Sequence, residues 1–129
     1  MKKLIIFILV VFSLGISNNH FKTNDKGMQL ALQGKYKEAL ANFIERCSNN
    51  EGYACGMVGY FYERGFGVNK NHDLAIKFYK KGCSLGDADS CTLLGYEEYK
   101  KRNLKEARKL LKKGCELGNK DACRYFNKI

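Results

Sequence analysis

Residues 75–91, AIKFYKKGCSLGDADSC, decide the fold because the same pattern occurs twice more in the chain. The related stretches are residues 39–55, ALANFIERCSNNEGYAC, and residues 107–123, ARKLLKKGCELGNKDAC. Each copy begins with alanine, has a cysteine eight residues later and has a second cysteine eight residues after the first. Each also has the pattern of one helix ending, a short turn and the next helix starting. The repetition predicts a chain built from similar helical units.

All six cysteines belong to these stretches, so the spacing predicts how they pair. Each C-x7-C pair brackets one turn between antiparallel helices, which predicts three local disulfides. The predicted pairs are Cys47–Cys55, Cys83–Cys91 and Cys115–Cys123. Zinc is the alternative, but structural zinc sites favour about two to four residues between paired ligands. The two histidines, His20 and His72, also lie outside the repeated stretches, so we expect neither a metal site nor a cofactor.

The N-terminal residues have the pattern of a secretory signal. Lys2 and Lys3 precede an apolar run at residues 4–12, and small residues follow. We therefore predict a signal peptide at residues 1–17, a polar leader at residues 18–26 and a periplasmic or secreted protein. An uncleaved N-terminal anchor is the alternative, but the apolar run is short for a membrane span. Disulfides persist in such oxidising compartments, and we expect no stable membrane insertion after cleavage.

Alignment on the cysteines gives a repeat period of 36 residues from Cys47 to Cys83 and of 32 residues from Cys83 to Cys115. A period in the thirties with two helices per unit is typical of an all-α solenoid, an α/α superhelix. We predict one repeat domain at residues 27–129. Its predicted units are residues 27–51, 52–87 and 88–119, followed by a capping helix at residues 120–129. The predicted helices are residues 25–33, 37–48, 52–64, 71–85, 88–101, 104–117 and 120–128.

Glycines recur at two kinds of position. Gly59 and Gly95 occupy equivalent places in the first helix of their units, where we expect two helices to cross closely. Gly86 and Gly118 follow the second helices, where a left-handed residue is favoured. Asn50, a residue type that tolerates this conformation, stands at the same place in the first unit.

Apolar spacing predicts which helix faces are buried. In the first unit Leu40, Phe43 and Ile44 share one face, and in the third unit Leu104 and Leu111 share the corresponding face. We expect both faces to contribute to the core, because a single unit cannot cover its own apolar face and must stack on its neighbours.

Two segments of the second unit resemble a known family. Residues 59–68, GYFYERGFGV, and residues 75–83, AIKFYKKGC, resemble a Sel1-like repeat. With the C-x7-C pairs and the predicted signal, the chain resembles the Helicobacter cysteine-rich proteins. The first unit departs from the pattern because it is truncated, and the third has Arg102-Asn103 in place of the G-x-G loop.

This resemblance implies a fold and two functions. The fold is a superhelix of disulfide-linked helical hairpins outside the cytoplasm. Sel1-like proteins mostly act as scaffolds for protein–protein contacts. Members of the cysteine-rich family have also been described as penicillin-binding proteins with β-lactamase activity.

Catalytic motifs argue against an enzyme. A serine β-lactamase needs lysine three residues after its nucleophile, and Ser48, Ser84 and Ser90 all lack one. The sequence also contains no S-D-N and no K-T-G motif. His72 is interpreted as a solvated residue at a helix start. Catalytic residues therefore remain unknown.

Formal net charge is +10, and it falls to +8 when residues 1–17 are removed. Basic residues cluster at residues 100–105 and at Lys109, Lys112 and Lys113. An exported protein rarely meets nucleic acid, so we expect no nucleic-acid partner. An envelope polyanion is one hypothesis for this surface, and a solvated helix face is the alternative.

The leading functional hypothesis is a scaffold that binds a protein or peptide. The alternative is a weak β-lactamase or penicillin-binding protein, with a β-lactam or a peptidoglycan fragment as ligand, and an envelope polyanion binder is third. In similar solenoids the first helix of each unit lines the concave side. Candidate binding residues by this equivalence are Tyr60, Glu63, Arg64, Tyr96, Glu97 and Lys100. For each tyrosine, core packing is the alternative role.

Overall fold

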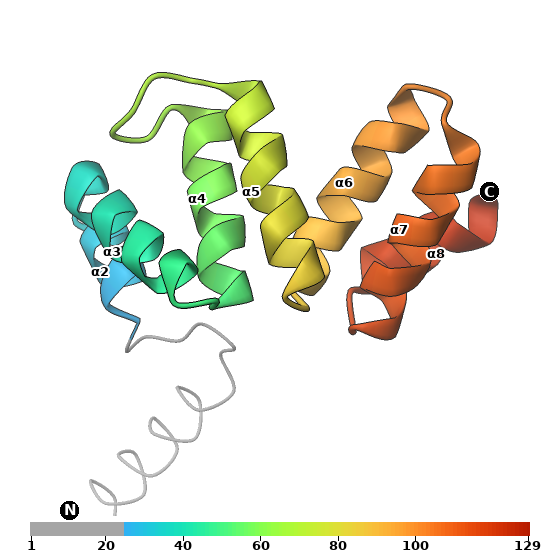
Figure 1. Ribbon diagram of the computed structural model, residues 1–129, viewed down its shortest axis with the longest axis horizontal. Coiled ribbons are helices and arrows are strands. Elements are labelled where there is room, and N and C mark those ends of the chain that lie inside the picture. The colour runs from blue at the N-terminus through green and yellow to red at the C-terminus, as the bar shows by residue number, and fades with distance from the viewer. Residues whose placement is uncertain (1–24) are drawn as a thin grey trace, which may run out of the picture.

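The computed structural model describes residues 25–129, which form seven α-helices and no strand (Figure 1). The predicted signal peptide and residues 18–24 of the predicted leader lie outside the described residues. In chain order the helices are α2 (Lys26–Leu32), α3 (Tyr36–Ser48), α4 (Gly52–Arg64), α5 (His72–Ser84), α6 (Ala88–Lys100), α7 (Leu104–Glu116) and α8 (Lys120–Lys128). The predicted helix boundaries differ from these by at most one residue.

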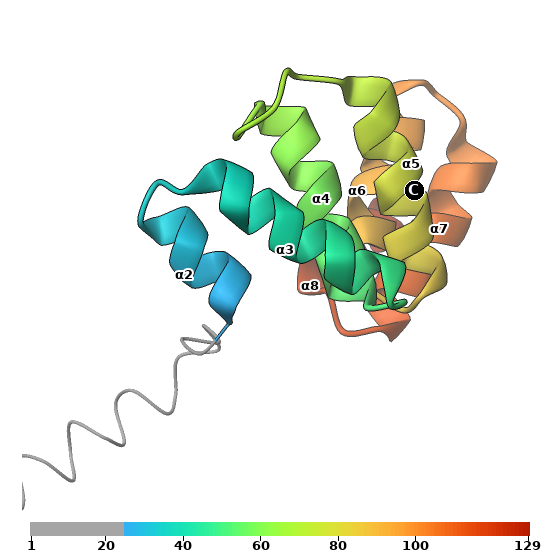
Figure 2. The same ribbon diagram turned by 60° about the vertical axis from the view of Figure 1, so that its left-hand side comes forward.

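The helices stack in chain order as a curved row of antiparallel pairs (Figures 1 and 2). Each helix packs on its neighbours in sequence, with α4 against α5 and α6 against α7 as the most extensive pairs. The first helices of successive units also touch, α4 with α6 and α6 with α8. Contacts between the second helices α3, α5 and α7 are sparser. The first helices therefore form the inner layer of an all-α superhelix, which confirms the predicted fold class.

Polar side chains and left-handed residues set the helix ends. The side chains of Asn71, Asp87 and Asn119 accept hydrogen bonds from backbone N–H groups in the first turns of α5, α6 and α8. After the second helices, Asn50 and Gly86 have φ values of 64° and 91°. Gly118 also has a positive φ, of 106°. The three predicted left-handed positions are therefore confirmed.

Glycines allow the two helices of each unit to approach closely. A Cβ atom on Gly59 would lie 2.6 Å from Cε1 of Tyr79, and one on Gly95 would lie 2.7 Å from Cγ of Leu111. Such distances are shorter than real Cβ contacts allow, so a side chain here would require Tyr79, Leu111 or the helices themselves to shift. The predicted close crossings at Gly59 and Gly95 are confirmed, and Gly27 repeats the arrangement in the first unit.

The predicted core faces are partly wrong. Phe43 and Leu111 are fully buried, as expected, but Ile44 is 39% exposed and Leu104 is 45% exposed. Both exposed residues lie at the edge of an apolar stripe on a second helix. The second helices have no further layer outside them, so the edge of the stripe stays in solvent.

Three disulfides join the helices at the corners between α3 and α4, α5 and α6, and α7 and α8. The bonded pairs are Cys47–Cys55, Cys83–Cys91 and Cys115–Cys123, as the spacing predicts. In each pair the Cα atoms are 4.6 Å apart. Each bond links the second helix of one unit to the first helix of the next. The bonds therefore join successive units and leave the α4–α5 and α6–α7 pairs to be held by packing.

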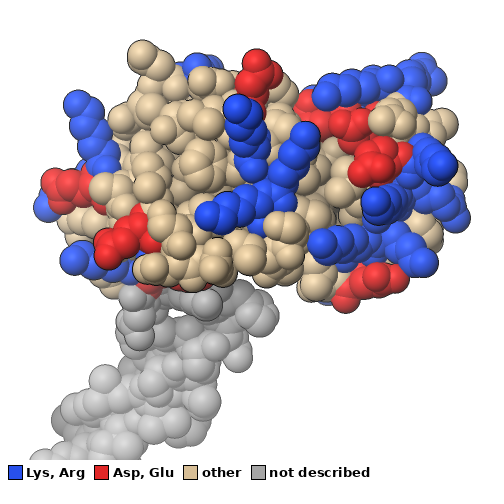
Figure 3. Space-filling view, viewed as in Figure 1, with Lys and Arg blue, Asp and Glu red and all other residues tan. Residues whose placement is uncertain are grey.

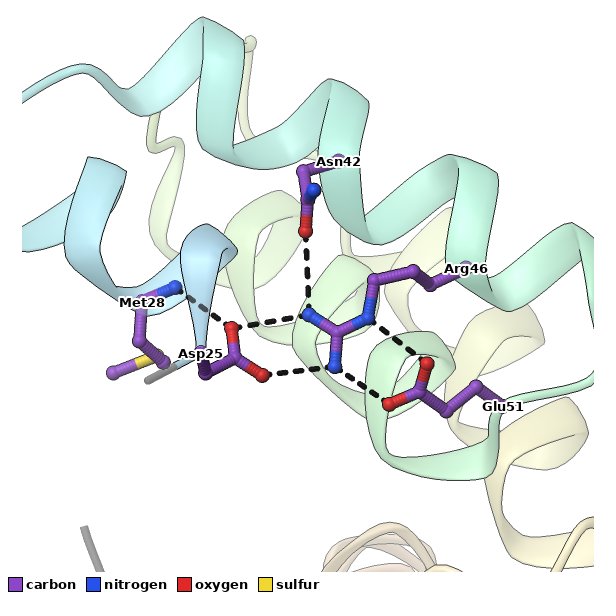
Figure 4. Close-up of polar contacts among 5 residues, drawn as sticks. All are labelled: Asp25, Met28, Asn42, Arg46 and Glu51. Carbon is purple, nitrogen blue, oxygen red and sulfur yellow. Dashed lines mark hydrogen bonds and ion pairs between the residues drawn. The ribbon is translucent and has the colours of Figure 1, made fainter. Parts of the chain in front are cut away.

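A partly buried ion-pair cluster around Arg46 ties the first unit together (Figure 4). The guanidinium of Arg46 in α3 donates to both carboxylate oxygens of Asp25, at 3.0 and 2.8 Å, and to both of Glu51, at 2.9 and 2.5 Å. Asn42 accepts a further bond from the same group. Asp25 precedes α2 and Glu51 precedes α4, so one side chain fixes the start of two helices. Nothing in the repeat pattern indicated this cluster.

The cluster perturbs the pKa values of its members. Burial of Asp25, whose side chain is 3% exposed, favours the neutral acid. Hydrogen bonds from Arg46 and from the backbone N–H of Met28 outweigh burial and hold the pKa of Asp25 below its ordinary value. The hydrogen bonds that Arg46 donates to Glu51 and Asp25 raise the pKa of its guanidinium above the ordinary value. The ion pair therefore persists to low pH.

Replacing Asp25 with asparagine should destabilise the fold at neutral pH. Asp25→Asn keeps the shape of the cap but removes the charge facing Arg46, and we expect the free energy of unfolding at pH 7 to fall by about 1–3 kcal/mol. Because the folded pKa of Asp25 is depressed, its contribution is complete above the unfolded pKa, about 3.9, and is lost as pH falls through the folded pKa. The two proteins should therefore converge in acid when urea unfolding is compared at pH 7 and below pH 3.

Glu45→Gln is the matched control, because Glu45 is an exposed carboxylate on the same helix. It should change stability by less than about 0.5 kcal/mol. Equal effects of the two substitutions, or a pH-independent effect of Asp25→Asn, would contradict a role for the ion pair.

A methyl group at Gly95 should destabilise the protein through its contact with Leu111. We expect Gly95→Ala to lower the free energy of unfolding by about 1–3 kcal/mol, although alanine favours helices intrinsically. In a Leu111→Ala background the clashing Cγ atom is absent, so the same change should cost less. A double-mutant cycle measured by urea unfolding tests this, and additive costs would show that the two residues do not interact.

Candidate functional site

The helices α4, α5 and α6 surround two adjoining hollows of about 160 and 350 Å³. Tyr60, Tyr79 and Leu93 line both, so the two form one depression, here called the α4–α6 groove. Its apolar and aromatic residues are Tyr53, Met57, Tyr60, Ile76, Tyr79 and Leu93. Its polar residues are Glu63, Arg64, Lys70, His72, Asp87, Asp89, Ser90 and Glu97.

Helical spacing places the aromatic side chains of α4 on one face. Tyr53, Met57 and Tyr60 are separated by four and three residues, so they lie one above another along the helix. Leu93 occupies the place in α6 that Met57 occupies in α4, when the units are aligned on their cysteines. Tyr53 is 36% exposed, Tyr60 37% and Leu93 41%, so these side chains are available to a ligand.

Cationic side chains lie over the tyrosine rings in two successive units. Cζ of Arg64 is 5.5 Å from the centre of the Tyr60 ring, and Nζ of Lys100 is 5.1 Å from that of Tyr96. Attraction between a cation and the face of a ring orients both groups. The recurrence gives the inner surface a repeating pattern of a tyrosine with a basic partner.

His72 links the three helices at one end of the groove. Its Nδ1 atom lies 2.8 Å from Oε2 of Glu63 in α4, and its Nε2 atom lies 3.6 Å from Oε2 of Glu97 in α6. Nζ of Lys100 lies 2.7 Å from Oε1 of Glu97. His72 is the first residue of α5 and its side chain is 50% exposed, so the predicted solvated position is correct but the two carboxylate partners were missed.

The groove also contains two titratable groups with raised pKa values, the buried Tyr79 and the half-buried Asp87. Burial raises the pKa of the Tyr79 hydroxyl, which keeps it neutral. Burial also raises the pKa of Asp87, although the Ser90 hydroxyl and backbone N–H donate to its Oδ2 atom at 2.5 and 3.1 Å. A Cβ on Gly56 would lie 2.5 Å from the same oxygen, so glycine leaves the room this cap needs.

This arrangement offers charged, hydrogen-bonding and apolar groups to a ligand. Ser90 is only 1% exposed. Its hydroxyl donates to the carboxylate of Asp87, the residue that caps the start of α6. Among residues 25–129, no group of three or more His, Cys, Asp or Glu side chains is placed to hold a metal ion. The described helices also include none with the length and apolarity needed to cross a membrane.

The structure divides the predicted binding residues into two groups. Those that line the groove are Tyr60, Glu63, Arg64 and Glu97. Tyr96 instead lies 5.6 Å from the ring of Tyr125, and Lys100 lines a separate hollow near the end of α8.

Of the six apolar and aromatic residues of the groove, the sequence predicted only Tyr60 as a binding residue. The five that it missed are Tyr53, Met57, Ile76, Tyr79 and Leu93. The helical spacing of Tyr53 and Met57 from Tyr60, and the equivalence of Leu93 to Met57, were the available signals.

The fold defines a class, the helical-repeat proteins whose units stack into a superhelix. Comparison with known proteins specifies the family within this class. The model of the Sel1 repeat matches residues 52–87 and residues 88–119, which together make up more than half of the chain.

Two solved structures resemble the fold. One is cysteine-rich protein B of Helicobacter pylori, which has a TM-score of 0.65 and 37% sequence identity over 68% of this chain and 69% of that one. The other is a Sel1 repeat protein from Oxalobacter formigenes, with a TM-score of 0.69 and 28% identity over 78% of this chain and 43% of that one.

A curated relative also matches part of the chain. It is named β-lactamase HcpA of Helicobacter pylori and is 37% identical over 52 residues. The match covers 40% of this chain and only 21% of that protein. The chain belongs to the Sel1 repeat family, within the group of Helicobacter cysteine-rich proteins.

Proposed function

We propose that the protein is a scaffold outside the cytoplasm that binds an extended protein or peptide segment in the α4–α6 groove. The single observation that carries this proposal is the set of partly exposed apolar side chains, Tyr53, Tyr60 and Leu93, in a concave surface. Tyrosine is a common anchor residue at interfaces. Sel1 repeats generally mediate protein interactions, which supports the same class of function.

Charges around the groove favour a ligand with both signs. Arg64 and Lys70 provide positive charge, while Glu63, Glu97 and Asp89 provide negative charge. The backbone and side chains of a peptide match such a surface with donors, acceptors and charges of both signs. Charge complementarity then contributes to partner choice more than to affinity.

Location outside the cytoplasm is supported by the disulfides. All six cysteines are bonded, and such bonds persist in oxidising compartments and are rare in the cytosol. The cysteine-rich relatives and the predicted signal peptide agree with this location. We propose that the protein is periplasmic or secreted.

A β-lactam or a peptidoglycan fragment is the alternative ligand. Its support is the resemblance to the cysteine-rich family and the name of the relative HcpA, and the match covers about a fifth of that protein. Ser48, Ser84 and Ser90 lack a lysine three residues on. Hydrolysis of nitrocefin by metal-free, oxidised protein would support this alternative over the scaffold.

Removing the Tyr60 side chain should weaken peptide binding. Peptides of about twelve residues would be selected from a random phage library on the oxidised protein, synthesised, and their Kd measured by calorimetry. We expect Tyr60→Ala to raise Kd by about tenfold or more, since a buried aromatic anchor contributes at least about 1.4 kcal/mol.

Tyr99→Ala is the matched control, because Tyr99 is a tyrosine of similar exposure, 42%, that lines a different hollow. It should change Kd by less than about twofold. Equal losses in the two variants would place the binding surface elsewhere. A large fall in the melting temperature of Tyr60→Ala alone would show that Tyr60 serves the core.

A further inference from the structure

The excess of positive over negative charge in residues 25–129 is concentrated at one end of the molecule. Residues 25–97 contain nine Lys or Arg and nine Asp or Glu, so that part of the chain is electrically balanced. Residues 98–129 contain eleven Lys or Arg and four Asp or Glu. Figure 3 shows lysine and arginine side chains crowded over the end formed by α6, α7 and α8. Solubility does not require the basic residues to gather at one end, because charged residues spread over the whole surface also keep a protein soluble.

The charge follows one face of α7. Lys105, Lys109 and Lys113 are separated by four residues each, and all three are exposed. Arg108 and Lys112 flank this row and are exposed as well. On the opposite side of the helix, Ala107, Leu111 and Gly114 are buried. These five basic residues are here called the α7 basic stripe.

Most of the stripe is not neutralised by nearby carboxylates. Lys112 lies 4.0 Å from Glu116, and Arg108 is directed at the ring of Phe126 and the carbonyl oxygen of Ile129. Lys105, Lys109 and Lys113 make no ion pair with any residue in the described part of the chain. Like charges four residues apart on a helix repel one another, so the stripe opposes folding in the absence of a counter-charge.

Comparison between units shows that the fold does not need these lysines. The place of Lys105 in α7 is taken by Lys37 in α3 and by Asp73 in α5. The place of Lys109 is taken by Ala41 and Lys77. The place of Lys113 is taken by Glu45 and Lys81. Alanine and both signs of charge therefore occupy the same places in the first two units. Only the third unit has lysine at all three.

We propose that the α7 basic stripe binds a linear anionic polymer, such as polyphosphate or an acidic polysaccharide. Successive lysines rise by about 6 Å along the helix, and the helix is about 20 Å long, so the stripe presents a row of charges to a chain of anionic groups. Its exposed side chains from Lys105 to Lys113 are all charged, which favours a chain of anionic groups along the row. Leu104 and Leu117 are exposed at its two ends, so binding to a lipid surface is the outcome against which the proposal is tested. The stripe lies on a second helix, apart from the α4–α6 groove, so this activity is independent of peptide binding.

Binding to long-chain polyphosphate tests the proposal on the oxidised protein. We expect binding at low salt that weakens steeply with added salt, because it releases counterions. Lys105→Gln/Lys109→Gln/Lys113→Gln should weaken binding by tenfold or more. Its melting temperature without polymer should be equal to or higher than that of the wild type, because repulsion is relieved.

The triple variant Lys26→Gln/Lys35→Gln/Lys37→Gln is the matched control, since it removes the same charge from exposed positions on α2, on α3 and in the turn between them. It should change the affinity by less than threefold. Equal losses in the two triples would show that only net charge matters and would overturn the proposal. Failure to bind polyphosphate, with binding to phosphatidylglycerol vesicles instead, would overturn it in favour of a lipid surface.

Discussion

The disulfide at each corner between units is the constraint on which the rest of the structure depends. Each bond joins the last turn of a second helix to the first turn of the next first helix, with Cα atoms 4.6 Å apart. Within a unit the helices meet instead through close packing, as at Gly59 against Tyr79 and Gly95 against Leu111. Two kinds of joint therefore alternate along the chain, covalent between units and packed within them. Closing each loop in the unfolded state stabilises the native state by about 2.5 kcal/mol in the chain-entropy model, which matters in a small domain with a limited core.

The candidate site exists because of the joint between the second and third units. The α4–α6 groove takes its walls from α4 and α5 of one unit and from α6 of the next. The bond between Cys83 and Cys91 holds that corner. His72, between Glu63 and Glu97, adds a polar link across the same three helices. The proposed binding would therefore depend on the stability of this corner, since separation of the two units would open the groove.

The sequence predicted the features that recur in every unit. Helix boundaries, cysteine pairs and the close approaches at Gly59 and Gly95 all follow from residues repeated at a fixed spacing. The Arg46 cluster was missed because it joins Asp25 to a residue 21 positions away and occurs in one unit only. Ile44 and Leu104 were wrongly placed in the core because helical periodicity defines the direction of a stripe and not how far the neighbouring layer covers it. Met57 and Leu93 were missed in the groove because an apolar residue on a helix face has the same pattern whether it packs inside or lines a hollow.

Urea unfolding of the oxidised protein, with and without excess reductant, tests the central claim most directly. If the corner bonds hold the units together, reduction should lower the free energy of unfolding by several kcal/mol, a large part of the roughly 5–15 kcal/mol typical of a domain. The unfolding midpoint should fall accordingly. An unchanged midpoint after complete reduction would contradict the account, because it would show that packing alone holds the superhelix.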